Sequence, residues 1–183
     1  MKKLRNTVIF LLIFAICASF LGFGSSSVQA LEYIRTQPGV DLRMMEWNDQ
    51  WILLGLPEET TVNQFFSMIH ASQSVSAMKD DVVLQGEDKI STGTMLVSGG
   101  IRLPIVIKGD TTGDGVVNLS DVLRIKAHFI GEFNLEDLYF AAADTTEDLI
   151  VNTKDYLQIK KYLWRRWNIY TNRNDFASNY DLQ

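Results

Sequence analysis

Hydrophobic and polar residues follow two different periods in the first half of this chain, and each period predicts a different element. Residues 51–54 (Trp-Ile-Leu-Leu) form a short apolar run that is typical of a buried strand. Residues 61–64 (Thr-Val-Asn-Gln) have the capping-box pattern of a helix start, with Thr at the N-cap and Gln three residues later. The apolar residues there recur at helical spacing, at Val62, Phe65, Phe66 and Ile69.

Four short apolar segments follow the predicted helix. Asp and Gly residues separate them, which is typical of short strands joined by tight turns. The segments are residues 75–78, 82–85, 94–97 and 101–107. Together with the helix they predict a small α+β module over residues 31–107, with one helix on a twisted sheet, whose last strand runs directly into the next part of the chain.

The second half of the chain contains two copies of a polar segment that leads into an amphipathic helix. Residues 110–121 read Asp-Thr-Thr-Gly-Asp-Gly-Val-Val-Asn-Leu-Ser-Asp, and residues 144–155 repeat seven of these twelve positions. Apolar residues then recur at i, i+3 and i+7, at Val122, Ile125 and Phe129 in copy 1 and at Tyr156, Ile159 and Leu163 in copy 2. A duplicated loop-helix unit therefore organises this half.

The spacing of oxygen-bearing residues in both copies predicts a calcium loop. Oxygen donors stand at loop positions 1, 3, 5, 9 and 12, and the carbonyl of position 7 can add another. A glycine at position 6 of the first copy, Gly115, suits the sharp turn that such a loop needs. The alternative is a polar turn that merely contains three aspartates. The expected ligands are Asp110, Thr112, Asp114, Val116, Asn118 and Asp121 in copy 1, and Asp144, Thr146, Asp148, Ile150, Asn152 and Asp155 in copy 2.

The two copies, each opening a helix and preceded by Ile107-Lys108-Gly109, resemble a type I dockerin over residues 108–167. The resemblance implies an all-α domain in which two calcium loop-helix repeats are related by a pseudo-twofold axis. It also implies two bound Ca²⁺ ions and attachment of a secreted bacterial protein to a cohesin domain of a scaffoldin or cell-surface protein. The stretch before it, with Gly-Leu-Pro ahead of the predicted helix, resembles a short module found N-terminal to dockerins in secreted Firmicute proteins.

Two features of this chain depart from the dockerin pattern. Position 3 is a threonine in both copies, Thr112 and Thr146, where the family usually has Asn or Asp. Position 6 of the second copy is Leu149, and a non-glycine residue in the left-handed conformation costs about 1–2 kcal/mol. We therefore expect the second loop to bind calcium less tightly than the first, or to adopt a distorted turn.

The resemblance also implies a cohesin-binding surface on each copy. The corresponding residues are Leu119, Ser120, Lys126 and Ala127 in copy 1, and Thr153, Lys154, Lys160, Lys161 and Arg165 in copy 2. Copy 1 is mostly apolar or small, whereas copy 2 carries four cations. We therefore expect the protein to prefer one of two binding orientations; the alternative is that the cations only form the solvated face of a terminal helix.

The N-terminus predicts export. Residues 1–30 begin with Lys2, Lys3 and Arg5, continue through an apolar run and end in small residues, as in a cleaved secretory signal peptide; a retained membrane anchor is the alternative. The only cysteine, Cys17, would leave with this peptide, which excludes disulfides, cysteine catalysis and cysteine-bound zinc from the mature chain. The formal net charge of −5 argues against nucleic acid as a partner.

Catalysis has little support in the sequence. The upstream acidic residues lie in turn-like clusters, and two histidines do not suggest a catalytic triad. Trp47 and Trp51 could stack on a sugar or fill a core. The prediction is a secreted, non-catalytic, calcium-dependent attachment protein with a polar, disordered tail at 168–183, from which Trp167 or Tyr170 could fold back. The alternative is a small cellulosome-type component that hydrolyses or binds polysaccharide.

Overall fold

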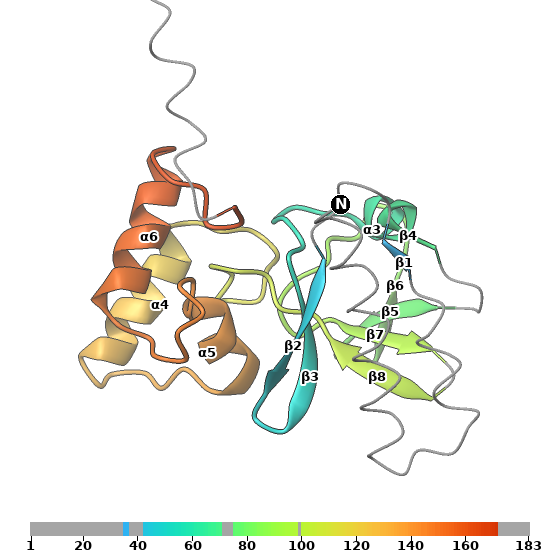
Figure 1. The fold of residues 1–183 in the computed structure, drawn as a ribbon, viewed down its shortest axis with the longest axis horizontal. Coiled ribbons are helices and arrows are strands. Elements are labelled where there is room, and N and C mark those ends of the chain that lie inside the picture. The colour runs from blue at the N-terminus through green and yellow to red at the C-terminus, as the bar shows by residue number, and fades with distance from the viewer. Residues whose placement is uncertain (1–34, 37–41, 71–74, 99, 172–183) are drawn as a thin grey trace, which may run out of the picture.

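The computed structural model describes residues 35–36, 42–70, 75–98 and 100–171, and these form an α+β structure. Three helices, α4, α5 and α6, lie on one side of the molecule, and most strands lie with helix α3 on the other (Figure 1). A two-stranded hairpin lies between the two sides. The predicted signal peptide falls outside the described residues, and so does the tail from residue 172 onward.

An antiparallel four-stranded sheet confirms the four strands that the apolar segments predict. Its order is β6-β5-β7-β8. The strands are β5 (Ser76–Lys79), β6 (Val82–Leu84), β7 (Met95–Ser98) and β8 (Ile101–Pro104). Asp80 and Asp81 join β5 to β6 with φ angles of 49° and 61°, the left-handed conformation of a two-residue hairpin turn.

The central hairpin pairs β2 (Arg43–Trp47) with β3 (Gln50–Leu54). The apolar run 51–54 predicts β3, and Ile52, Leu53 and Leu54 are all buried in the structure. The sequence misses β2, in which only Trp47 is buried and no apolar alternation marks the strand. The sequence also misses a two-residue pairing of β1 (Arg35–Thr36) with β4 (Ile69–His70), too short to leave a periodic pattern.

Helix α3 (Val62–Met68) begins where the sequence predicts. Thr61 caps it, and the reciprocal hydrogen bonds between Thr61 and Gln64 complete the capping box. Phe65 is fully buried in the main apolar cluster with Ile90, Ile105 and residues of the four-stranded sheet and of β3. The helix therefore packs between the four-stranded sheet and the rest of the N-terminal half.

Two helices follow the two polar loops, also as predicted. They are α4 (Leu119–Phe129) and α6 (Thr153–Leu163), with the short α5 (Asp137–Ala143) between them. Their inward residues form a separate apolar cluster, made by Val117, Val122, Ile125, Leu135, Ala143 and Ile159. No described helix has the length and apolarity that crossing a membrane requires.

The chain turns back after α6. Ile169 is fully buried, and the Tyr170 hydroxyl donates a hydrogen bond to the Lys108 carbonyl at 3.4 Å. The same hydroxyl accepts one from the Glu58 N–H at 3.1 Å. The predicted return of Tyr170 to the strand before the first loop is therefore observed. The prediction of disorder is wrong for residues 168–171, because the sequence cannot show that Ile169 has a pocket to fill.

Candidate metal centre and docking helices

Residues 110–121, here called loop 1, fold around the carboxylate of Asp110. This side chain is fully buried. Its Oδ1 accepts hydrogen bonds from the N–H groups of Gly113 at 2.8 Å and Asp114 at 3.1 Å, and its Oδ2 accepts one from Gly115 at 3.2 Å. One carboxylate at loop position 1 thus closes the sharp turn through position 6.

Asp121, at position 12, closes the other end of loop 1. Its Oδ1 accepts hydrogen bonds from the N–H and the hydroxyl of Thr112, both at 2.9 Å. Its Oδ2 accepts one from the Asn118 N–H at 2.8 Å. Asp121 therefore belongs at once to the loop and to the first turn of α4, which ties the loop conformation to the helix.

Residues 144–155, here called loop 2, repeat this arrangement. Asp144 Oδ2 accepts from the Leu149 N–H at 2.8 Å, and Asp155 Oδ1 accepts from the Thr146 N–H at 3.0 Å and its hydroxyl at 2.9 Å. Leu149 has a φ of 66°, close to the 81° of Gly115. The left-handed conformation predicted for Leu149 is confirmed, and these contacts of the loop 1 turn are retained with leucine there.

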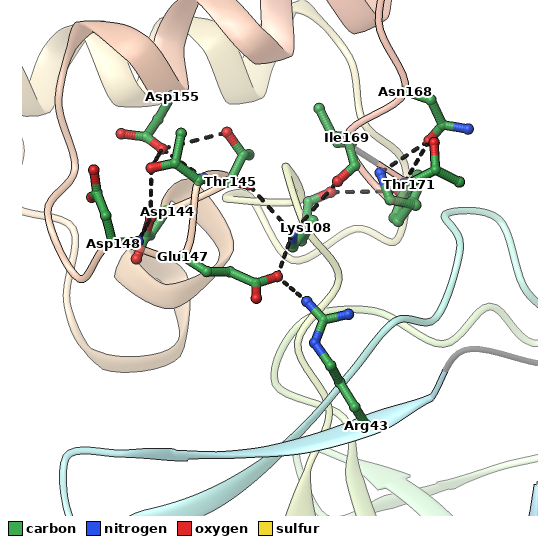
Figure 2. Close-up of polar contacts among 12 residues, drawn as sticks. Arg43, Lys108, Asp144, Thr145, Glu147, Asp148, Asp155, Asn168, Ile169 and Thr171 are labelled. Atoms are coloured by element: carbon green, nitrogen blue, oxygen red, sulfur yellow. Dashed lines mark hydrogen bonds and ion pairs between the residues drawn. The ribbon is translucent and has the colours of Figure 1, made fainter. Parts of the chain in front are cut away.

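Three carboxylates converge in loop 2. Oxygen atoms of Asp144, Asp148 and Asp155 all lie within 4.8 Å of one another, and Figure 2 shows the three side chains facing a common space. No other acidic, histidine or cysteine cluster this close occurs in the described part of the chain. The sequence predicts loop 1 as the tighter calcium site. The three carboxylates that converge, however, lie in loop 2.

The electrostatics of both loops suit a cation. Burial raises the pKa of the Asp110 and Asp144 carboxyls, and the negative charges of Asp121 and Asp155 add to this. The ion pairs among the described residues join Glu147 to Arg43 and Lys108, and Glu59 to Lys89, and none includes these aspartates. A hard divalent cation with oxygen ligands would supply the missing positive charge.

Two of the predicted ligands have a second role that the calcium-loop spacing does not reveal. Asn118 and Asn152, at position 9, are the N-caps of α4 and α6, and each side-chain oxygen accepts a hydrogen bond from the backbone N–H two residues later, at 2.7 and 2.8 Å. The signal was available, because Asn-x-x-Asp before an apolar helix is a variant of the capping box. Position 9 therefore sets the start of each helix.

The predicted partner residues lie on α4 and α6, except Arg165, which follows α6. Leu119 is 64% exposed, and Ser120, Lys126, Thr153, Lys154, Lys161 and Arg165 are also exposed, while Ala127 and Lys160 are half-buried. The Lys160 ammonium lies 5.3 Å from the Tyr156 ring centroid and 5.2 Å from that of Trp164. Two further leucines are exposed on these helices, Leu123 on α4 and Leu157 on α6, each four residues beyond the helix start.

The two upstream tryptophans do not form an exposed platform on which a sugar could stack. Trp47 is 6% exposed and belongs to an apolar cluster with Ile52 and Val106. Trp51 is half-buried and packs against the main cluster. Both side chains therefore serve the core.

Comparison with known proteins identifies the helical part. A search of curated proteins and a search of solved structures found no match to the chain. The family model described as the Dockerin type I domain matches residues 108–164, which contain both loops and α4, α5 and α6. The match, the repeated loop geometry and the two exposed helices agree, and residues 108–164 of this chain are a type I dockerin domain, the module that binds cohesin domains.

Proposed function

We propose that this protein is a secreted, non-catalytic attachment protein whose dockerin domain binds Ca²⁺ in both loops and docks onto a cohesin of a scaffoldin or cell-surface protein. The observation that carries the calcium part is the convergence of Asp144, Asp148 and Asp155 to within 4.8 Å. Three like charges at that separation repel one another, and a bound dication converts the repulsion into attraction. The leader-like residues 1–30 support secretion.

A second Ca²⁺ ion in loop 1 is supported because the backbone of loop 1 is held in the same way as that of loop 2. Asp110 and Asp144 both accept from the backbone N–H groups at positions 5 and 6, and Asp121 and Asp155 both accept from those at positions 3 and 9. The proposed ligands in each loop are the side chains at positions 1, 3, 5 and 12, the carbonyl at position 7, and the asparagine at position 9. Because these asparagines cap the helices, calcium binding and helix formation would be coupled.

Calcium removal should therefore destabilise the domain. At a free calcium concentration about a thousand times the dissociation constant, each site adds about 4 kcal/mol to the free energy of unfolding. That is comparable with the whole stability of a small domain, about 5–15 kcal/mol. We expect a chelator to lower the melting temperature and to abolish the pull-down of the mature protein by a panel of cohesin domains.

The decisive variant is Asp148→Ala. Titration calorimetry should show one calcium site fewer than in the unsubstituted protein, because the loop loses one of its three converging carboxylates. Glu132→Ala is the control, since Glu132 is an exposed acidic residue of the same domain outside both loops. Unchanged calcium binding in Asp148→Ala would remove the assignment of loop 2.

The polysaccharide alternative retains one supporting observation. A cavity of about 390 Å³ lies between the β2–β3 hairpin and the dockerin domain, and Glu46, Trp47, Asp137 and Phe140 contribute to its lining. The Trp47 indole N–H is buried and has no hydrogen-bond partner among the described residues. If this cavity takes a sugar, soluble oligosaccharides should quench tryptophan fluorescence, and Glu46→Gln should weaken the effect. No quenching at millimolar oligosaccharide would leave only the attachment function.

A further inference from the structure

The residues that precede the dockerin domain contact both of its loops. Here the described residues 42–107 are called the N-terminal region. It donates or accepts hydrogen bonds at loop 1 through Glu58, Glu59, Lys79 and Thr92. At loop 2 it reaches Glu147 through Arg43. None of these residues is among the predicted cohesin-binding residues, so the contacts call for an explanation of their own.

The N-terminal region contacts loop 1 at several successive points. The Thr92 N–H donates to Asp110 Oδ2 at 2.8 Å, and the Lys79 ammonium donates to the Gly113 carbonyl. Further along the loop, the Glu59 N–H donates to the Gly115 carbonyl at 2.8 Å. The N-terminal region thus contacts loop positions 1, 4 and 6.

Glu58 makes the most specific of these contacts. One carboxylate oxygen accepts a hydrogen bond from the Val117 N–H, and the other accepts one from the Tyr162 hydroxyl on α6. Val117 directly follows Val116, whose carbonyl is the expected position-7 ligand. Holding the Val117 N–H orients the Val116–Val117 peptide, which is the group that carries this carbonyl. Glu58 is therefore connected to the expected calcium-binding carbonyl through a single peptide group.

Loop 2 is held by charge. Glu147, at loop position 4, pairs with Arg43 of β2 and with Lys108, whose side chain is 6% exposed. Lys108 also donates to the Thr145 carbonyl at 3.3 Å, and Figure 2 shows this network beside the cluster of Asp144, Asp148 and Asp155. These pairs hold the Glu147 carboxylate on the side of the N-terminal region. A partly buried network of this kind restricts the loop more than an exposed ion pair would.

We propose that the N-terminal region is a positioning element for the dockerin's calcium sites, in which Glu58 orients loop 1 and Arg43, through Glu147, orients loop 2. The inference rests on the proposed calcium binding of the two loops. A loop held in its bound shape loses less conformational entropy when the ion binds, so its affinity is higher. Residues that orient metal ligands typically change metal affinity about 10–100-fold when they are removed.

The test measures the calcium affinity of each loop separately in the chain without residues 1–30. Asp148→Ala leaves loop 1 as the reporting site, and Asp114→Ala leaves loop 2. In the first background, Glu58→Ala should weaken calcium binding about 10–100-fold by titration calorimetry. In the second, Arg43→Ala should weaken it by about tenfold. Each variant should leave the other loop within about twofold, a selectivity that general destabilisation would not produce.

Matched variants control for charge and folding. Glu87→Ala removes an exposed carboxylate of the same region that is hydrogen-bonded to Asn63, and Arg102→Ala removes an exposed cation from β8. Both should leave the two affinities unchanged. Glu58→Gln keeps an oxygen that can accept from the Val117 N–H, so it should recover most of the lost affinity.

A second readout does not depend on the ion. In chelator, hydrogen exchange at the Val117 amide should be faster in Glu58→Ala than in the unsubstituted chain, and unchanged in Glu87→Ala. Equal affinities in all variants, or equal losses at both loops, would overturn the inference. If the unsubstituted chain binds no calcium, the proposed function fails instead, and the exchange rates still show whether Glu58 holds the loop.

Discussion

Loop 1 and loop 2 share one backbone design but differ in their surroundings. Asp110 and Asp144 are both buried and accept the N–H of the position-6 residue, Gly115 or Leu149. Around loop 1 the N-terminal region approaches closely, whereas position 6 of loop 2 is open, and Leu149 is 62% exposed. The residue at position 6 is thus under a steric limit in loop 1 and only a conformational one in loop 2.

The largest effect should come from giving loop 1 a side chain at position 6. In Gly115→Ala, the new Cβ would lie 2.7 Å from the Ile90 carbonyl oxygen, so backbone must move. Together with the left-handed φ of 81°, this should cost at least about 2 kcal/mol in the free energy of unfolding. Urea denaturation with calcium present measures it. Leu149→Ala is the matched control and should change stability little; similar losses in both would mean that the surroundings of the loops do not matter.

The opposite substitution in loop 2 should be smaller and favourable. Leu149→Gly removes the left-handed strain at a φ of 66° and should add about 1 kcal/mol to stability and tighten calcium binding. The leucine also lines the cavity beside Trp47, so the gain measures strain relief minus this contact. Calorimetry of loop 2 in the Asp114→Ala background tests the affinity. Weaker binding would show that Leu149 contributes more by packing than it costs by strain.

The smallest effect should come from the cations of copy 2. Replacing Lys160 and Lys161 by Ala should slow association with an acidic cohesin a few-fold at low salt and leave little difference at high salt. The paired variant replaces Leu119 and Ser120 by Asp on copy 1 and should matter for a cohesin with an apolar face. Surface plasmon resonance at two ionic strengths separates them. Equal losses in both variants, or none, would contradict a preferred orientation.

Several elements of the fold could be predicted because their signals are local. The capping box at Thr61 marks α3, and the period of Val122 and Ile125 marks α4. By contrast β2 could not be predicted, because Met44 contacts one apolar cluster while Met45 and Trp47 contact another, which leaves no single alternating pattern along the strand. Short pairings such as β1 with β4 depend on segments more than thirty residues apart, which no local pattern reveals.

The candidate site divides in the same way. The positions of Asp110, Asp121 and their copies follow from a spacing that is repeated in the chain, and so does the left-handed residue at position 6. The roles of Glu58 and Arg43 do not. Glu58 stands in a turn-like acidic segment of the sequence, yet its carboxylate accepts hydrogen bonds from the Val117 N–H and the Tyr162 hydroxyl.

The sequence by itself determined the two loops, the helices that follow them and the dockerin resemblance, because a metal loop and a helix cap are built from neighbours within twelve residues. Only the tertiary structure decided which loop has converging carboxylates and which groups hold each loop from outside. Those contacts join residues as far apart as Arg43 and Glu147, separated by 104 positions. Contacts at such separations depend on how the sheets pack against the helices, and no single stretch of sequence encodes that packing.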